Sequence, residues 1–191
     1  MKSKMKLLAA ACLTATALTA MADTSFSMYD GRSTDKSNGA IAHTNLFILK
    51  TSLTDKLDGD VFILNKTYDT TETVTTREEL GLTYKEPVTG TVTAWSRFSL
   101  GEKQKSGAEA TSYYTIEPGV LVKLPANFSV KVSYYHRDAW GTTTDSDKMN
   151  EMRYAVNYNV TPKDRITVGV FRGISGYQPA NLVYGGYTRS F

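Results

Sequence analysis

Cysteine, histidine and proline are scarce in this sequence of 191 residues, which contains one cysteine, two histidines and five prolines. The cysteine, Cys12, lies in an N-terminal segment that we expect to be removed, so the mature chain can form no disulfide in an oxidising compartment. The two histidines, His43 and His136, are far apart in the sequence and give no recognisable set of metal ligands. We therefore expect no cofactor and no metal, and stability must come from hydrogen bonding and packing.

A long hydrophobic run is absent after residue 22. The first six residues carry three lysines, and residues 7–22 have no charge. This order, together with the small residues Ala20 and Ala22, is typical of a secretory signal peptide. A membrane-anchoring helix is the alternative, but the stretch is interrupted by threonines and is shorter than the roughly 20 residues that such a helix needs. We expect cleavage after Ala22, which leaves residues 23–191 as one domain.

Residues 8–11, directly before Cys12, loosely resemble the motif that precedes the acylated cysteine of bacterial lipoproteins. Cleavage at Cys12 would leave an apolar segment of about five residues, whereas signal peptides use roughly 7 to 15. We therefore interpret Cys12 as an ordinary residue of the signal peptide.

The expected mature chain has no excess of charge of either sign. The whole sequence has 22 basic and 19 acidic side chains, and the three lysines of the signal peptide account for the difference. A chain without net charge has no general attraction for nucleic acid or for an anionic lipid surface. We expect no nucleic acid partner, although charges can still be segregated between two faces of the fold.

Apolar residues recur at every second position in much of the mature chain, which is the period of a β-strand. Along residues 113–124, for example, Val120 falls on the apolar strand face and Lys123 on the opposite one. Residues 128–137 and 151–160 repeat the pattern. Each segment is about 10 residues long, which matches the roughly 9 to 11 residues of a tilted strand that crosses a bilayer and exceeds the usual strand of a soluble sheet.

The connecting segments alternate between two kinds. Some are tight polar turns in which Pro, Gly, Asn or Asp supplies the backbone geometry, and the others are longer and rich in Gly, Ser, Thr and Asp. The expected turns are residues 54–58, 86–90, 124–127 and 161–164, and the expected loops are residues 32–39, 69–75, 101–111, 141–150 and 175–181. Short periplasmic turns and longer extracellular loops are typical of outer-membrane barrels.

These observations predict an all-β fold, an antiparallel up-and-down transmembrane β-barrel of about ten strands, with eight or twelve as the alternative counts. A soluble β-sandwich is the competing fold. The apolar runs at residues 46–49 and 61–64 are continuous, so they would also fit the core of a sandwich, and their strand faces stay unassigned.

The C-terminus favours the barrel. The sequence ends on Phe191, and Tyr187 and Val183 share its strand face. This arrangement looks like the signal by which the barrel assembly machinery recognises its substrates, with Arg189 and Gly185 departing from the ideal pattern. An ordinary edge strand that ends in Phe is the alternative. The strand lengths and the signal peptide favour a barrel in the outer membrane of a Gram-negative bacterium.

The polar face of the later strands carries the candidate functional residues, because that face of a barrel points into the lumen. Basic side chains outnumber acidic ones on it, so a narrow lumen would attract anions and its guanidinium groups could bind carboxylates. The alternative is a ladder of Arg–Glu pairs that fills the barrel and only stabilises it. We predict that the lumen is lined by Arg77, Arg97, Glu117, Lys123, Lys131, Arg137, Arg153 and Arg165.

Three segments carry a family resemblance: residues 76–85, residues 152–158 and the C-terminal residues 187–191. Each is a strand that begins with charge and then alternates, and together with the signal peptide and the terminal Phe they resemble the oligogalacturonate-specific porins. The resemblance implies a small monomeric porin with an arginine-lined lumen and acidic oligosaccharides as its solutes. That family is usually described with twelve strands.

The sequence therefore predicts an outer-membrane porin with a narrow, anion-preferring channel for small solutes. Its expected partners are outer-membrane lipids, the barrel assembly machinery and periplasmic chaperones during assembly, and small anionic solutes or oligosaccharides. A non-conducting barrel that acts as an anchor or as an adhesin through its loops is the first alternative, and the sequence does not separate it from a porin.

A barrel enzyme is the second alternative. His136 lies two residues from Asp138 and would share its strand face near an outer loop, which is where a general base oriented by a carboxylate could act. The spacing is unspecific, because a histidine next to a loop at the barrel rim has the same pattern. We therefore expect no enzymatic activity.

The chain exported by a Gram-negative host should begin at Asp23. The intact mass of the protein extracted from the outer membrane tests this expectation, because cleavage after Ala22 removes residues 1–22 together with Cys12. A retained N-terminus would indicate an anchoring helix, and a lipid-modified chain that starts at Cys12 would identify a lipoprotein.

Overall fold

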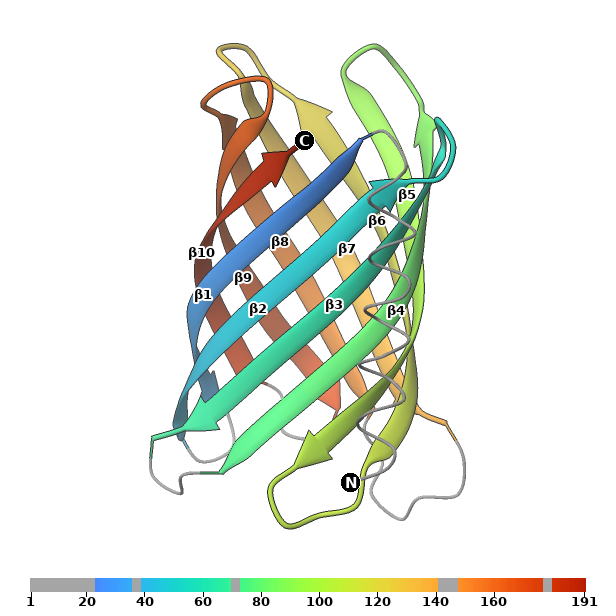
Figure 1. Cartoon of the computed structure of the whole chain (residues 1–191). Coiled ribbons are helices and arrows are strands. Elements are labelled where there is room, and N and C mark those ends of the chain that lie inside the picture. The colour runs from blue at the N-terminus through green and yellow to red at the C-terminus, as the bar shows by residue number, and fades with distance from the viewer. Residues whose placement is uncertain (1–22, 36–38, 70–72, 141–147, 177–179) are drawn as a thin grey trace.

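Ten antiparallel β-strands close into one barrel in the computed structural model (Figure 1). The strands are β1 (Thr24–Asp35), β2 (Ile41–Ser52), β3 (Leu57–Tyr68), β4 (Val74–Pro87), β5 (Val92–Lys105), β6 (Thr111–Lys123), β7 (Phe128–Ala139), β8 (Met149–Asn159), β9 (Asp164–Gly176) and β10 (Ala180–Ser190). The structure describes residues 23–35, 39–69, 73–140, 148–176 and 180–191, so the expected signal peptide and Cys12 lie outside the described residues. Among the residues described, no helix has the length and apolar character needed to span a membrane.

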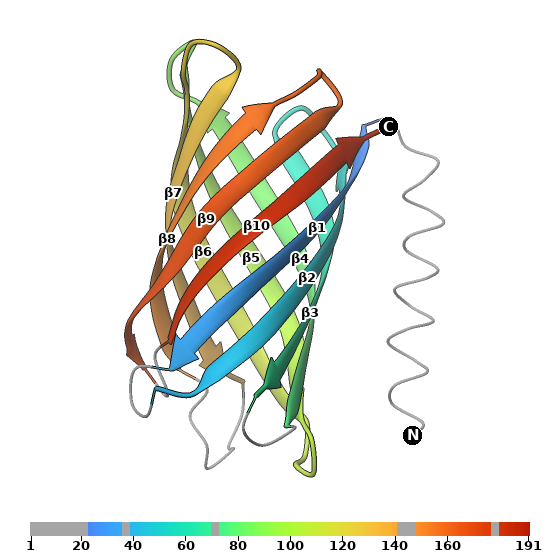
Figure 2. The same cartoon turned by 90° about the vertical axis from the view of Figure 1, so that its left-hand side faces the viewer.

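Each strand pairs with its neighbours in the sequence, and the first strand pairs with the last (Figure 2). β1 and β10 run side by side, with Ser25 opposite Ser190 at one end and Asp35 opposite Ala180 at the other. This pairing leaves no free sheet edge, which is the condition for a sheet in lipid. The topology confirms the predicted all-β, up-and-down barrel and its count of ten strands.

Side chains alternate along the strands between an apolar exterior and a mostly polar interior. Phe98, Val120 and Val168 are among the large apolar side chains exposed on the outside. The register also resolves the two continuous apolar runs of the early strands. Leu46 and Phe62 lie on the inward face and are buried, while their neighbours in the chain point outward. Such an exterior fits the hydrocarbon region of a bilayer.

Several strands extend further than the sequence predicted. β1 continues to Asp35 and β5 to Lys105, so parts of the expected loops 32–39 and 101–111 are paired strand. The expected loops 69–75 and 175–181 are shortened in the same way, and most of the loop 141–150 lies outside the described residues. Both strand faces are polar in these stretches, as expected where the wall continues past the apolar exterior into water, so the alternation that marks a strand is lost.

Four short turns lie at the end of the barrel where β1 begins and β10 ends; we call this the turn end, and the opposite one the loop end. Thr54, Thr89 and Thr161 each accept, at Oγ1, a hydrogen bond from the backbone N–H three residues later, at 3.0, 3.1 and 3.0 Å. In the fourth turn Ala126 and Asn127 have positive φ. The turns contain the Pro, Gly, Asn or Asp residues that the sequence analysis expects, and the threonine hydroxyl is an additional turn signal that sequence reasoning missed.

One exposed ion pair ties the β2–β3 turn to β4. Lys56 donates to both carboxylate oxygens of Glu86, at 2.8 and 2.9 Å. This hydrogen bonding, together with the negative charge of Glu86, raises the pKa of Lys56 above its ordinary value. Because both side chains are open to solvent, the pair contributes little to stability.

Two inward-facing glycines allow aromatic rings to lie flat against the barrel wall. A Cβ at Gly169 would lie 2.4 Å from the ring of Tyr184, and a Cβ at Gly119 would lie 2.5 Å from the ring of Trp95. In both cases the ring belongs to the residue directly paired with the glycine on the adjacent strand. A ring that lies along the wall takes less of the lumen's width than one that stands out from it.

Replacement of Gly169 by alanine should destabilise the barrel, because the new methyl group has to push the Tyr184 ring off the wall. Overpacking of this kind costs about 1–3 kcal/mol. The urea midpoint of the protein folded in lipid measures the effect. Gly185→Ala is the matched control, since its Cβ would have no other atom closer than 4.0 Å. Equal midpoints for the two variants would contradict the described position of the ring.

Candidate functional site

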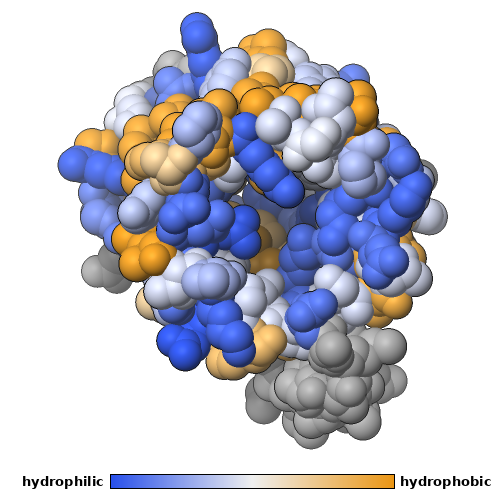
Figure 3. All heavy atoms as spheres, turned by 90° about the horizontal axis from the view of Figure 1, so that it is seen from above, coloured by the Kyte–Doolittle hydropathy of each residue, from blue (hydrophilic) through white to orange (hydrophobic). Residues whose placement is uncertain are grey.

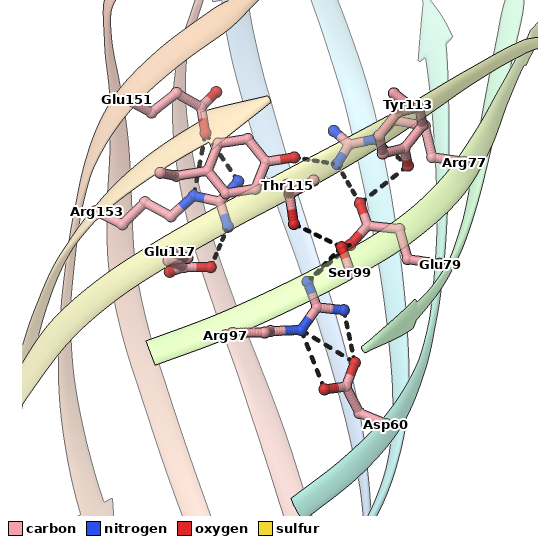
Figure 4. Close-up of polar contacts among 11 residues, drawn as sticks. Asp60, Arg77, Glu79, Arg97, Ser99, Tyr113, Thr115, Glu117, Glu151 and Arg153 are labelled. Atoms are coloured by element: carbon pink, nitrogen blue, oxygen red, sulfur yellow. Dashed lines mark hydrogen bonds and ion pairs between the residues drawn. The ribbon is translucent and has the colours of Figure 1, made fainter. Parts of the chain in front are cut away.

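A set of paired charges crosses the lumen at the middle of the strands (Figure 4). Its members come from five different strands and all lie at inward-facing positions. We call this set the charged belt, and it consists of Asp60 on β3, Arg77 and Glu79 on β4, Arg97 on β5, Glu117 on β6, and Glu151 and Arg153 on β8.

Glu79 is the centre of one half of the belt. Its Oε1 accepts hydrogen bonds from Arg77 Nη2 at 2.7 Å and from the Tyr113 hydroxyl at 2.9 Å. Its Oε2 accepts from Arg97 Nη1 at 2.8 Å and from the Ser99 hydroxyl at 3.0 Å. Each carboxylate oxygen of Glu79 therefore accepts from one charged and one neutral donor. A buried charge is stable only when it is paired and hydrogen-bonded in this way.

Arginines join the remaining carboxylates in the same way. Arg97 Nη2 donates to Asp60 Oδ1 at 2.6 Å. Arg153 lies between two glutamates, donating from Nη1 to Glu117 Oε2 at 3.0 Å and from Nη2 to Glu151 Oε2 at 2.9 Å. Glu117 Oε1 also accepts from the Ser133 hydroxyl at 2.7 Å. The belt therefore uses the planar guanidinium fork to connect carboxylates from different strands.

Tyr135 connects the two halves of the belt. Arg77 Nη2 donates to the Tyr135 hydroxyl at 3.0 Å, and the guanidinium carbon of Arg153 lies 3.5 Å from the centre of the Tyr135 ring. Glu79 is 3% exposed and Arg77 is 9% exposed, so the belt is largely removed from water. A buried ion pair of this kind stabilises only while both partners are present, because a single remaining charge is left uncompensated.

Lys131 lies beside the belt without an ion pair. Within the described ranges no carboxylate lies at ion-pair distance from it, and its ammonium instead lies 3.8 Å from the centre of the Trp95 ring. The carboxylate with the largest electrostatic effect on Lys131 is that of Glu117, which already accepts hydrogen bonds from Arg153 and Ser133. Its hydrogen-bonding capacity is therefore available to a solute.

More cations lie between the belt and the turn end. Lys50 and Lys85 both form ion pairs with Asp58, which is fully buried; the Lys85 Nζ lies 2.7 Å from Asp58 Oδ1. Lys123 occupies an inward-facing position at the end of β6. The Nε atom of Arg165 has no hydrogen-bond partner among the residues that the structure describes.

The structure places all eight residues of the sequence-predicted lumen set at inward-facing strand positions, and their role toward a solute stays a prediction. The belt contains Arg77, Arg97, Glu117 and Arg153, while Lys131, Lys123, Arg165 and Arg137 lie outside it. Sequence reasoning missed Lys50, Asp58 and Asp60. These residues lie on β2 and β3, where apolar side chains occupy both faces and the face of a charge could not be assigned.

The other side of the lumen carries apolar and aromatic side chains, which we call the apolar wall. Leu46, Phe62 and Leu64 form its buried core. Tyr29, Ile48, Phe171 and Tyr184 complete it and are half-buried. The Tyr184 ring packs against Phe171 with 4.8 Å between ring centres and edge-on against Tyr29 at 5.6 Å.

The remaining sequence candidates lie outside the lumen. His136 donates from Nδ1 to Asn150 Oδ1 at 2.8 Å, and Asp138 instead accepts from the backbone N–H of Ala139, so the imagined His–Asp pair does not form. Tyr187 and Phe191 are exposed on the outer side at the turn end. Their role in recognition by the assembly machinery stays a prediction. No cluster of metal-ligating side chains occurs in the part of the chain that is described.

No protein-family model matches the sequence, and no curated protein matches it either. Solved structures do match the fold. An outer membrane channel from Pseudomonas putida F1 superposes with a TM-score of 0.61 at 12% identity, covering 90% of this chain and 96% of that chain. The NanC porin superposes with a TM-score of 0.50 at 12% identity, covering 87% and 100% of the two chains.

The chain is an outer-membrane β-barrel. Its structural neighbours are outer-membrane porins and channels. They include the KdgM porin, with a TM-score of 0.46 at 12% identity and coverage of 87% and 99%. At these identities the likeness shows the fold alone.

Loss of the Glu79 charge should strongly destabilise this barrel, because Glu79→Gln leaves the buried Arg77 and Arg97 with too little negative charge. Breaking a buried pair from one side costs about 3–5 kcal/mol. The folded fraction in a urea titration measures the effect. Glu78→Gln is the matched control: the neighbouring residue points outward and lies opposite Glu102, so its neutralisation removes a like-charge contact. A Glu79→Gln barrel as stable as this control would contradict the described belt.

Proposed function

We propose that this outer-membrane barrel forms a narrow channel for small solutes with a preference for anions. The distribution of inward-facing charge supports the proposal. The belt has three arginines against four carboxylates, and Lys131 beside it makes up the difference. The middle of the lumen is therefore close to neutral, and any preference has to arise at its two mouths.

Both mouths carry more cations than anions among the described residues. Inward-facing positions toward the turn end hold one acid, Asp58, and positions toward the loop end also hold one, Asp35. The inward-facing cations are Lys50, Lys85, Lys123 and Arg165 toward the turn end, and Lys66, Lys103 and Arg137 toward the loop end. Low-dielectric walls focus such charge, which raises the local concentration of anions at each mouth.

Solvent reaches the interior along the apolar wall. Tyr29, Ile48, Phe171 and Tyr184 point inward and are only half-buried, whereas a filled barrel would enclose them. From the turn end, Figure 3 shows a hollow in the middle of the barrel with mostly hydrophilic residues around it. Ten strands lie between the eight-stranded barrels that side chains fill and the wide porins of about 16 strands. These features support a passage that is narrow.

A non-conducting barrel is the second candidate function, and the belt itself is the observation that favours it. The hydrogen bond from Arg77 to Tyr135 joins β4 to β7 and so crosses part of the lumen. If the belt and the apolar wall together left no continuous path for a solute, the barrel would serve as an anchor or adhesin. Acidic oligosaccharides, the solutes implied by the sequence resemblance, would be excluded in that case.

Single-channel recording separates the two candidates. The protein purified from the outer membrane of an expressing host and inserted in a planar bilayer should show discrete openings, and its reversal potential in a salt gradient should indicate anion preference. Because the responsible charges lie at the mouths, the preference should weaken as the Debye length falls from about 10 Å at 0.1 M salt to about 3 Å at 1 M. Folded protein without openings would support the anchor instead.

A charge reversal tests where the preference arises. Lys123→Glu places an anion at the turn-end mouth and should lower the anion preference at low salt. Lys163→Glu makes the same change in the exposed turn at residues 160–163, outside the lumen, and should have a smaller effect. If the two variants shift the reversal potential equally, the mouth charges do not set the selectivity.

A further inference from the structure

The lumen has two unlike sides, and they meet where β8 pairs with β9. The belt occupies β3 to β8, whereas the strands from β9 through β10 and β1 to β2 turn the half-buried apolar wall toward the same space. Arg153 and Phe171 are directly paired residues of β8 and β9, and the guanidinium carbon lies 4.2 Å from the ring centre. A solute in the passage therefore contacts polar groups on one side and aromatic rings on the other.

Small residues lie between Lys131 and the ring of Tyr184 in one row of paired residues. The residue directly paired with Lys131 is Ala155 on β8, and the next one along the sheet is Gly169 on β9. The ring of Tyr184 lies flat over Gly169. This row places no bulky side chain between Lys131 and the Tyr184 ring, and the ammonium group of Lys131 lies over Trp95 on the β5 side.

The Lys131 ammonium has three N–H donors and no acid paired with it among the described residues. The charged groups around it are Glu117, which is already bonded, and the cations Lys50, Arg97 and Arg153. Lys50 comes from β2, on the other side of the barrel. A carboxylate that entered this space would meet cations on several sides and no uncompensated anion.

We propose that the lumen binds small aromatic carboxylates, with the ring flat against Tyr184 and the carboxylate on the ammonium of Lys131. The inference rests on the proposed function, because it names the class of anion that the channel would carry. Stacked aromatic rings attract each other beyond the area that they bury, and an ammonium–carboxylate hydrogen bond is of the stronger, charge-assisted kind. Acetate has the charge without the ring, and benzyl alcohol has the ring without the charge.

Trp95 provides a signal for binding that does not depend on conduction. The chain has two tryptophans, and Trp140→Phe leaves Trp95, next to Lys131, as the only one. The folded protein in detergent is titrated with sodium benzoate, sodium acetate and benzyl alcohol, with excitation at the red edge of tryptophan absorption. Benzoate should change the Trp95 emission saturably. Acetate and benzyl alcohol should each reach half-saturation only at a concentration at least about tenfold higher, a difference of about 1.4 kcal/mol in binding free energy.

Two variants in the Trp140→Phe background assign the site. Lys131→Gln removes the charge without breaking an ion pair and should weaken benzoate binding about tenfold. Tyr184→Leu removes the flat ring and should also weaken it, provided that heat-dependent gel migration shows a folded barrel. Lys163→Gln, in an exposed turn, is the matched control and should bind as before. Equal affinity for acetate and benzoate, or an unchanged Lys131→Gln variant, would overturn the proposal.

The fluorescence titration and the bilayer recording fail independently. A barrel that conducts but shows no saturable benzoate signal keeps the channel and overturns the aromatic carboxylate site. A silent barrel that binds benzoate in a Lys131-dependent way supports the site and removes the channel.

Discussion

The backbone hydrogen bonds between β1 and β10 are the contacts on which the rest of this structure depends. Lipid offers no partner for an unpaired N–H or C=O group, so a sheet in a membrane is stable only when its two edges pair with each other. The wall of the closed barrel is a single sheet, so every strand has one face toward lipid and one toward the lumen. The alternation along each strand therefore determines both the apolar surface toward lipid and the composition of the interior.

A wall of this kind leaves little room for an ordinary hydrophobic core. Leu46, Phe62 and Leu64 form a small one on the inner face of β2 and β3. Over β3 to β8 the interior is instead held by charge pairs and by the hydroxyls of Tyr113 and Tyr135. Nearly balanced charge allows so many ionised groups to be buried together, because each carboxylate of the belt accepts from at least one guanidinium.

The sequence indicated the fold well where the two faces differ. Val120 and Lys123 show the alternation of β6 clearly, and the strand count and closure followed from such segments. The faces of β2 and β3 could not be read, because their apolar residues are consecutive, and this concealed Lys50 and Asp60. The partners within the lumen were not predictable at all. The pairing of Arg153 with Glu117 skips β7, so it depends on register and on strand tilt, which no local pattern encodes.

The two sides of the lumen also differ in how far apart their residues lie in the chain. Arg77 and Tyr135, which connect the halves of the belt, are 58 residues apart, whereas Ser27 and Thr188 of β1 and β10 are 161 apart. Loop closure costs more entropy as the separation grows, so the belt can form while strands are added in order, before the ends of the sheet meet. Tyr29 and Tyr184 belong to those ends. The contact between Tyr29 and Tyr184 therefore requires closure between β1 and β10, whereas the charge pairs of the belt, which lie within β3 to β8, do not.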